Sequence, residues 1–258
     1  MDRNFQEEIN NKILPIKRQY YFVKGNFMKF FPKDKKTFVE AALMLLLAVA
    51  WNQAAYNGGR LIANSWHHYD MTTSFDNMVP LVPWTVVIYF GCYITWGINY
   101  YICTTGDKEV RDHFFMADAI SKIICFIFFL AIPTTNIRPE ITGTGIWDYG
   151  MRFLYGIDNP DNLFPSIHCL VSWFCWIGVR KRKDVHIVYR YFSLLMAIAV
   201  CVSTLTTRQH VVVDIIGAIV IAEVCYIIAK PRKINRIYGI VLEKIKRILR
   251  IEKSNCKE

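Results

Sequence analysis

The chain has 258 residues, of which 53% are hydrophobic and only 20% are charged. This composition excludes a disordered or fibrous chain, and apolar stretches long enough to span a bilayer indicate a polytopic membrane protein. The formal net charge is +10, but Lys and Arg cluster beside the apolar stretches rather than along one basic face. We therefore attribute the charge to membrane topology and expect no nucleic acid partner.

Six apolar segments approach the roughly 20 residues that a helix needs to cross a bilayer core. They run from Phe38 to Tyr56, Leu81 to Cys103, Phe114 to Ile132, Phe164 to Val179, Ile187 to Val202 and Val211 to Ala229. The sequence thus predicts an all-α integral membrane protein with six transmembrane helices. This core covers residues 38–230 and follows a basic and aromatic segment, residues 1–37.

The positions of Lys and Arg predict the orientation, because positive charge is retained on the cytoplasmic side. Nine of them precede the first span and ten follow the sixth. We therefore expect a multi-pass protein of the cell membrane with both termini in the cytoplasm. The connecting segments 57–80, 133–163 and 203–210 are then extracytoplasmic, and no cleaved signal peptide is expected.

Two segments outside the spans carry their own patterns. Within residues 231–258, apolar residues recur at helical spacing with Lys and Arg mostly off that stripe. This predicts an amphipathic helix that lies on anionic lipid, or alternatively one that binds a partner. The segment from Pro133 to Leu163 is too long for a tight turn, and it is either a connector or a short helix over a cavity.

Eight cysteines lie mostly inside apolar stretches and form no CxxC pair. They are typical of small buried side chains rather than of a disulfide framework or a zinc site. The adjacent His67 and His68, with Asp70 nearby, cannot easily bind one ion together. We therefore expect no metal ligands in this chain.

Polar clusters occur at the ends of the apolar spans, where ionisable groups are costly and need a partner or a function. The clusters contain Arg138 in an outer segment, Ser166 and His168 at the start of the fourth span, Ser203 to Gln209 before the sixth span, and His210 and Asp214 at its start. The charge count places all of them at the same outer face, which indicates a shared site.

The spacing of His210 and Asp214 suits a catalytic pair. Residues four apart share one face of a helix, so the carboxylate can orient one imidazole nitrogen and raise the basicity of the other. A nucleophilic or general-base histidine requires such a partner. The same pattern also fits a purely structural pair.

The remaining residues of the clusters suit an anionic ligand. Pro165 and Ser166 mark a helix start just before His168, and the free N–H groups of a helix start attract phosphate. Arg138 and Arg208 add guanidinium groups, which bind phosphate oxygens in bidentate geometry. Alternatively, this is a simple helix cap beside arginines that bind lipid headgroups. Together the residues provide for phosphoryl transfer without a metal or other cofactor.

Three motifs carry a family resemblance. They are Arg138-Pro139, then Pro165-Ser166-Ile167-His168, then Ser203 with His210 and Asp214. In order and spacing they resemble the KxxxxxxRP, PSxH-like and SRxxxxxHxxxD motifs of the type 2 phosphatidic acid phosphatase superfamily. The resemblance covers about residues 38–230 and implies a six-span enzyme that acts on a lipid phosphate.

The resemblance also implies a role for each matched residue. His210 would attack phosphorus and form a phosphohistidine, Asp214 would orient it, and His168 would protonate the departing alcohol. The residues expected to hold or line the phosphate are Arg138, Arg208, Ser166 and Ser203.

Two motif positions depart from the family pattern. Ala131 occupies the position of the lysine in the first motif, and Thr204 occupies the position of the arginine in the third. This chain therefore lacks two phosphate-binding cations that the hydrolases of the family have at these positions. The third motif is more similar to the inositol phosphorylceramide synthase-like branch. A lipid or polyprenyl phosphate phosphatase is the favoured interpretation, a transferase of phosphorylated headgroups is the alternative, and a non-catalytic lipid-phosphate binder or transporter is the alternative of another class.

Overall fold

The computed structural model describes residues 35–249, and these residues are mostly helical. The elements are α2 (Lys35–Ala63), β1 (Tyr69–Asp70), α3 (Ser74–Met78), the 3₁₀ turn η1 (Pro83–Thr85), α4 (Val86–Thr104), α5 (Lys108–Ala131), β2 (Thr134–Thr135), α6 (Ile146–Ile157), α7 (Ile167–Val179), α8 (Ile187–Thr206), α9 (Val212–Ile228) and α10 (Arg232–Ile248). Most of the predicted N-terminal segment 1–37, and the end of the predicted segment 231–258, lie outside the described residues.

Helices α2, α4, α5, α7, α8 and α9 occupy the positions of the six predicted spans. Within residues 35–249, four helices are long and apolar enough to cross a membrane: α2, η1 with α4, α5, and α8. Helices α9 and α10 qualify only as a pair, bent by 93°, and α7 is a shorter apolar helix. The fold is therefore that of a membrane-embedded helical protein with four or five candidate spans, and the count of six stays a prediction.

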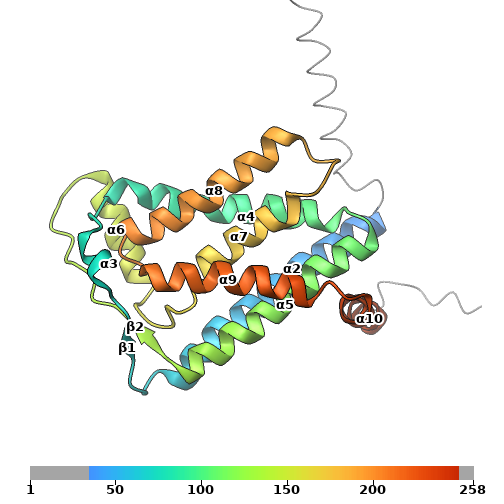
Figure 1. Ribbon diagram of the computed structural model, residues 1–258, viewed down its shortest axis with the longest axis horizontal. Helices are drawn as coiled ribbons and strands as arrows, with labels where there is room; N and C mark the ends of the chain where they lie inside the picture. Colours follow the sequence, from blue (N-terminus) through green and yellow to red (C-terminus); the bar gives the residue numbers. More distant parts are fainter. Residues whose placement is uncertain (1–34, 250–258) are drawn as a thin grey trace, which may run out of the picture.

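The long helices lie side by side, with α3, α6 and the β1–β2 pair at one end and α10 at the other (Figure 1). Helix α7 lies inside this bundle, in contact with α4, α8 and α9. Its side chains Leu170, Phe174 and Ile177 are buried. A helix that is apolar on all sides needs protein or lipid around it, and α7 is covered by its neighbouring helices.

The charges inside the third predicted span are paired. Asp118 and Lys122 are one turn apart on α5, and their side chains form an ion pair of 2.8 Å. The hydroxyl of Tyr100 donates a second hydrogen bond to Asp118 at 2.7 Å. This pairing lowers the cost of placing two ionisable groups within an apolar helix.

The three segments predicted to share the outer face meet at one end of the bundle. Strand β1 pairs in parallel with β2, so that Tyr69 is opposite Thr134. The amide N–H of Val82 donates to the carbonyl of Thr206 at 2.9 Å. Asn136 donates to the carbonyl of Arg208 at 3.0 Å. These contacts bring the predicted polar clusters to the same end.

The helix predicted after Pro231 is present as α10. It packs against α5, where Tyr238 stacks on Phe115 with ring centroids 5.5 Å apart and Leu242 is buried. Ile240 and Ile248 on the same helix are exposed. Its predicted location on a lipid surface stays a prediction.

Candidate active site

A cavity of about 270 Å³ lies at the end of the bundle where the outer segments meet. Its walls come from α2, α4, α6 and the start of α7, from the loop between α6 and α7, and from the residues before α9. Both predicted histidines, His168 and His210, line it. The segment that the sequence left as a connector or a short helix contains α6, whose residues Leu154 and Ile157 cover one side of this cavity.

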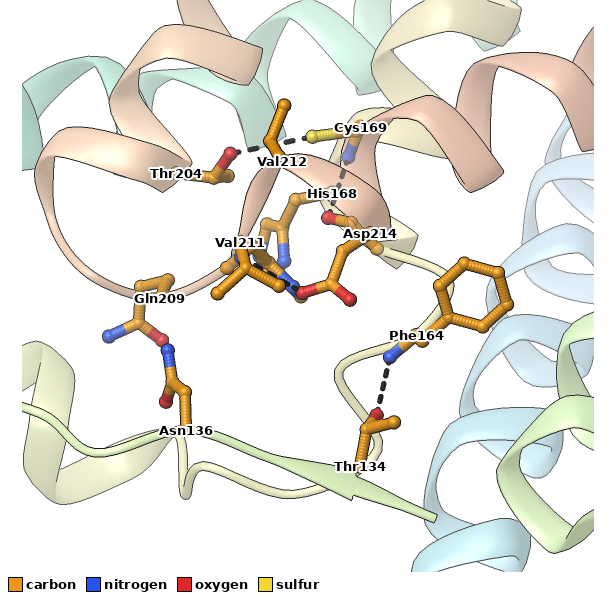
Figure 2. A network of polar contacts seen from close by, with 12 residues as sticks. Thr134, Asn136, Phe164, His168, Cys169, Thr204, Gln209, Val211, Val212 and Asp214 are labelled. Atoms are coloured by element: carbon orange, nitrogen blue, oxygen red, sulfur yellow. Dashed lines mark hydrogen bonds and ion pairs between the residues drawn. The ribbon is translucent and has the colours of Figure 1, made fainter. Parts of the chain in front are cut away.

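His210 and Asp214 form the predicted pair in a different geometry. His210 Nδ1 lies 3.1 Å from Asp214 Oδ2, and the N–H of Val211 donates to the same oxygen at 3.0 Å (Figure 2). The expectation that both residues are on one helix is wrong, because α9 begins at Val212. The carboxylate instead extends back from the first turn to cap the helix and hold the imidazole, since the first N–H groups of a helix have no partner within it.

The Asp214 contact determines which nitrogen of His210 carries a proton. A carboxylate accepts only, so Nδ1 of His210 donates, and Nε2 has the free electron pair when the ring is neutral. Burial alone would lower the pKa of His210, but the hydrogen bond and charge of Asp214 outweigh burial and raise this pKa above its ordinary value of 6.5. The arrangement is chemically suited to a nucleophile or a general base.

His168 is positioned by the start of α7. Ser166 is the N-cap residue, and its side chain accepts a hydrogen bond from the N–H of Cys169 at 3.3 Å. The N–H of Ser166 donates to the carbonyl of Asp214 at 3.2 Å, which joins the starts of α7 and α9. As a result, the ring centroids of His168 and His210 are 6.2 Å apart.

Asp158 is a candidate that the motifs do not include. It accepts hydrogen bonds from the hydroxyls of Tyr89 at 2.8 Å and Tyr56 at 2.9 Å. The Tyr89 oxygen also lies 3.2 Å from Nδ1 of His168. Because Tyr89 has a single proton and gives it to Asp158, its oxygen accepts the proton on Nδ1 of His168. Asp158 thus orients His168 through Tyr89, as Asp214 orients His210 directly.

The environment of Asp158 keeps it charged. Burial alone would raise its pKa, but the charge of His168 and the hydrogen bonds from Tyr89 and Tyr56 hold the pKa of this carboxyl below its ordinary value. Nε2 of His168 is the nitrogen left for proton exchange, and it contacts the hydroxyl of Tyr93 at 3.1 Å. In the sequence, Asp158 is only part of a turn-forming run, and its partners come from distant helices.

Arg138 does not itself line this cavity, but it contacts two residues that do. Its guanidinium donates to the carbonyl of Asp158 and, at 2.8 Å, to the side-chain oxygen of Gln209, which itself lines the cavity. Among the described residues, Nε of Arg138 and Nε2 of Gln209 are buried donors with no hydrogen-bond partner. Buried donors in native proteins normally have an acceptor, and a phosphate oxygen is a strong one. No motif in the sequence marks Gln209.

Arg208 and Ser203 lie outside this cavity. The guanidinium of Arg208 donates to the carbonyls of Asp76 and Val79, each at 2.5 Å, and lines a separate cavity of about 540 Å³ on another side of His210. Its backbone φ of 55° is in the left-handed region, where the chain reverses between α8 and α9. The hydroxyl of Ser203 donates to the carbonyl of Thr85 at 2.8 Å. The structure therefore places neither residue in the cavity that the two histidines share, although Arg208 lines the second cavity together with His210.

The described residues give no metal centre near the site. Within residues 35–249, no three His, Cys, Asp or Glu side chains are placed to hold one ion. His67 stacks edge-on against Tyr69, with ring centroids 4.8 Å apart. Nδ1 of His68 lies 2.9 Å from the carbonyl of Trp66.

Comparison with known proteins gives one match. A family model described as the PAP2 superfamily matches residues 63–228, which is more than half of the chain. The matched range contains His168, His210 and Asp158, whereas most of α2 precedes it. No curated protein and no solved structure matches the chain.

Proposed function

The chain belongs to the PAP2 superfamily, the type 2 phosphatidic acid phosphatase family that its motifs resemble, and from this premise we propose that it hydrolyses a lipid or polyprenyl phosphate through a phosphohistidine. Membership supports an activity of the phosphatase or phosphotransferase type. One observation carries the finer proposal: His168 and His210 line one cavity with ring centroids 6.2 Å apart, and each has its Nδ1 directed to a carboxylate, directly or through Tyr89. The site is proposed to face the extracytoplasmic leaflet.

In the first step, Nε2 of His210 attacks phosphorus and the bond between phosphorus and the lipid oxygen breaks. His168, doubly protonated as an imidazolium in this proposal, donates its Nε2 proton to that oxygen, so the lipid leaves as a neutral alcohol. The phosphoryl group remains on His210, where Asp214 stabilises the positive charge that develops on the ring.

In the second step, a water molecule attacks the phosphohistidine. His168, which has lost its proton, now accepts one from this water, and the bond between Nε2 of His210 and phosphorus breaks. Inorganic phosphate leaves and both histidines return to their starting states. Neither step requires a metal ion or a cofactor.

The phosphoryl oxygens are proposed to lie against Arg138, Gln209 and the start of α7, which Ser166 caps. The unpartnered donors Nε of Arg138 and Nε2 of Gln209 support this placement. Arg208 and Ser203 do not contact the phosphate in this proposal, because their donors are engaged by backbone carbonyls. The donors of Arg138, Gln209 and the start of α7 are held in place, and such fixed donors stabilise the charge of the transition state.

Transfer of a phosphorylated headgroup to a lipid alcohol is the second candidate, and the charge of the cavity favours it. Asp158 and Asp161 both line the cavity, and Asp161 pairs with Arg60 at 3.0 Å. Ala131 and Thr204 stand where the family motifs have cations, so fewer positive charges are available to offset the negative charge of the substrate. A phosphodiester with one negative charge suits such a cavity better than a monoester with two. This also matches the resemblance to the inositol phosphorylceramide synthase-like branch.

Product analysis in detergent micelles separates these functions. The purified protein is incubated, with a chelator present, with phosphatidic acid, lysophosphatidic acid, undecaprenyl pyrophosphate, or phosphatidylinositol plus ceramide. Free phosphate together with the dephosphorylated lipid, which is an alcohol from a monophosphate and undecaprenyl phosphate from the pyrophosphate, supports hydrolysis. A new phospholipid without free phosphate supports transfer. Lipid binding that persists in His210→Ala, with no turnover in the unaltered protein, supports a binder or transporter and contradicts the proposal.

A further inference from the structure

An apolar groove continues the active-site cavity into the bundle. It has a volume of about 280 Å³ and is bordered by α2, α4, α5 and α7. Four residues line both spaces: Asn52, Gln53, Tyr93 and Trp96. The shared residues make the groove an extension of the site that contains His168 and His210.

The direction of the groove follows from the residue positions on each helix. On α4 the active-site cavity is lined from Tyr89 to Trp96, and the groove from Tyr93 to Tyr100. On α2, which runs the opposite way, the groove is lined from Leu45 to Gln53. The groove thus runs away from the outer loops. The seven helical steps from Tyr93 to Tyr100 correspond to about 10 Å at the rise of an α-helix.

The walls of the groove suit hydrocarbon. The apolar residues that line it are Leu45, Ala48, Val49, Gly97 and Val171. Asp118 and Lys122 also line it, but their charges are paired with each other, and Tyr100 donates to Asp118. The groove therefore offers apolar surface next to a polar cavity. This arrangement matches a lipid, which has an apolar chain attached to a phosphorylated head.

We propose that this groove, formed by residues 45–53 of α2, residues 93–100 of α4 and Val171 of α7, binds a hydrocarbon chain of the substrate lipid. The inference rests on the proposed function in one respect, because the proposed function places the phosphate of the substrate between His168 and His210. The occupant is the substrate's own chain rather than bulk lipid, because the groove joins the catalytic cavity.

Gly97 provides a direct test. A Cβ atom added at Gly97 meets nothing within 4 Å, so a larger side chain there fills groove space without a backbone clash. Gly91 on the same helix also has nothing within 4 Å and does not line the groove. Gly97→Leu and the matched control Gly91→Leu therefore both replace a glycine of α4 by leucine, but only Gly97 lines the groove.

The experiment uses the full chain in detergent micelles and a phosphatidic acid whose acyl chain carries a diazirine. After irradiation, peptide mapping locates the adducts. We expect adducts on residues 45–53 or 93–100 in the unaltered protein and in Gly91→Leu, and loss of these adducts in Gly97→Leu. Adducts confined to other helices, or equal labelling of the groove in both variants, would overturn the inference.

Turnover distinguishes this inference from the proposed function. Where the protein hydrolyses phosphatidic acid, Gly97→Leu should raise KM for the dioleoyl lipid and leave p-nitrophenyl phosphate hydrolysis unchanged, with Gly91→Leu unaltered for both. Equal effects on both substrates would contradict the groove but not the catalytic proposal. Groove adducts in a protein that turns over neither substrate would contradict the catalytic proposal but not the groove.

Discussion

The rings of His168 and His210 lie with centroids 6.2 Å apart, at the starts of two different helices. The hydrogen bond from the N–H of Ser166 to the carbonyl of Asp214 joins these two helix starts. The distance leaves room for a phosphoryl group that both imidazoles contact, one as nucleophile and the other as proton donor.

The two histidines should differ in their dependence on the leaving group. His210→Ala should abolish turnover of every substrate, because it removes the nucleophile. His168→Ala should slow release of a lipid alcohol by about 10²- to 10⁴-fold, the usual contribution of a general acid. It should slow formation of the phosphohistidine from p-nitrophenyl phosphate much less, since p-nitrophenolate leaves without a proton. Pre-steady-state kinetics of this first step with both substrates checks this, and equal losses of the first step in His168→Ala would contradict its role as the acid.

The Asp214 carboxylate should set the acid limb of the pH profile. His210 attacks in its neutral form, so kcat/KM falls as the pH drops through the pKa of His210, which Asp214 holds above 6.5. Asp214→Asn removes that charge, so the acid limb should move to lower pH while the maximal rate falls. Glu140→Gln, an exposed residue at the same end, is the control with the same charge change. An acid limb that stays in place in Asp214→Asn would exclude His210 as the titrating group.

Asp158 and Tyr89 should act as positioning residues. Asp158→Asn and Tyr89→Phe each break the hydrogen-bond chain to His168, so both should lower kcat for the lipid with little change in KM. Because the chain supports the proton donor, the first step with p-nitrophenyl phosphate, measured as the burst of p-nitrophenolate, should be affected less. Tyr149→Phe, an exposed tyrosine on α6, should have no effect. A uniform loss of the first step with both substrates would indicate that Asp158 only stabilises the fold.

Arg138 should contribute to phosphate binding through its planar geometry. Its guanidinium contacts the carbonyl of Asp158 and the side chain of Gln209 at once, which the single ammonium of a lysine cannot reproduce. Arg138→Lys should therefore weaken inhibition by inorganic phosphate or vanadate by about 10-fold or more, since a charged hydrogen bond contributes about 1.5–3 kcal/mol. Unchanged inhibition would remove Arg138 from the phosphate site.

Much of the fold follows from local sequence patterns. Apolar length located α2, α4, α5, α7, α8 and α9, because the period and composition of a helix are local properties. The four-residue spacing correctly paired His210 with Asp214. It gave the wrong local geometry, because a carboxylate in the first turn of a helix can bond backward past the N-cap residue.

Other parts of the site depend on long-range contacts that no local pattern encodes. Asp158 acquires its role from Tyr56 and Tyr89, which belong to two other helices. Arg208 is close to His210 in sequence, yet the left-handed backbone at Arg208 directs its side chain to carbonyls of the segment around α3. Proximity in sequence is therefore a poor guide to orientation where the chain reverses.

Trapping the covalent intermediate tests the central claim most directly. The protein is incubated with a ³²P-labelled substrate lipid phosphate, quenched in alkali to preserve phosphohistidine, and digested for peptide mapping. The account predicts label on the peptide that contains His210, and no label in His210→Ala. Label on a different residue, or turnover retained by His210→Ala, would contradict it.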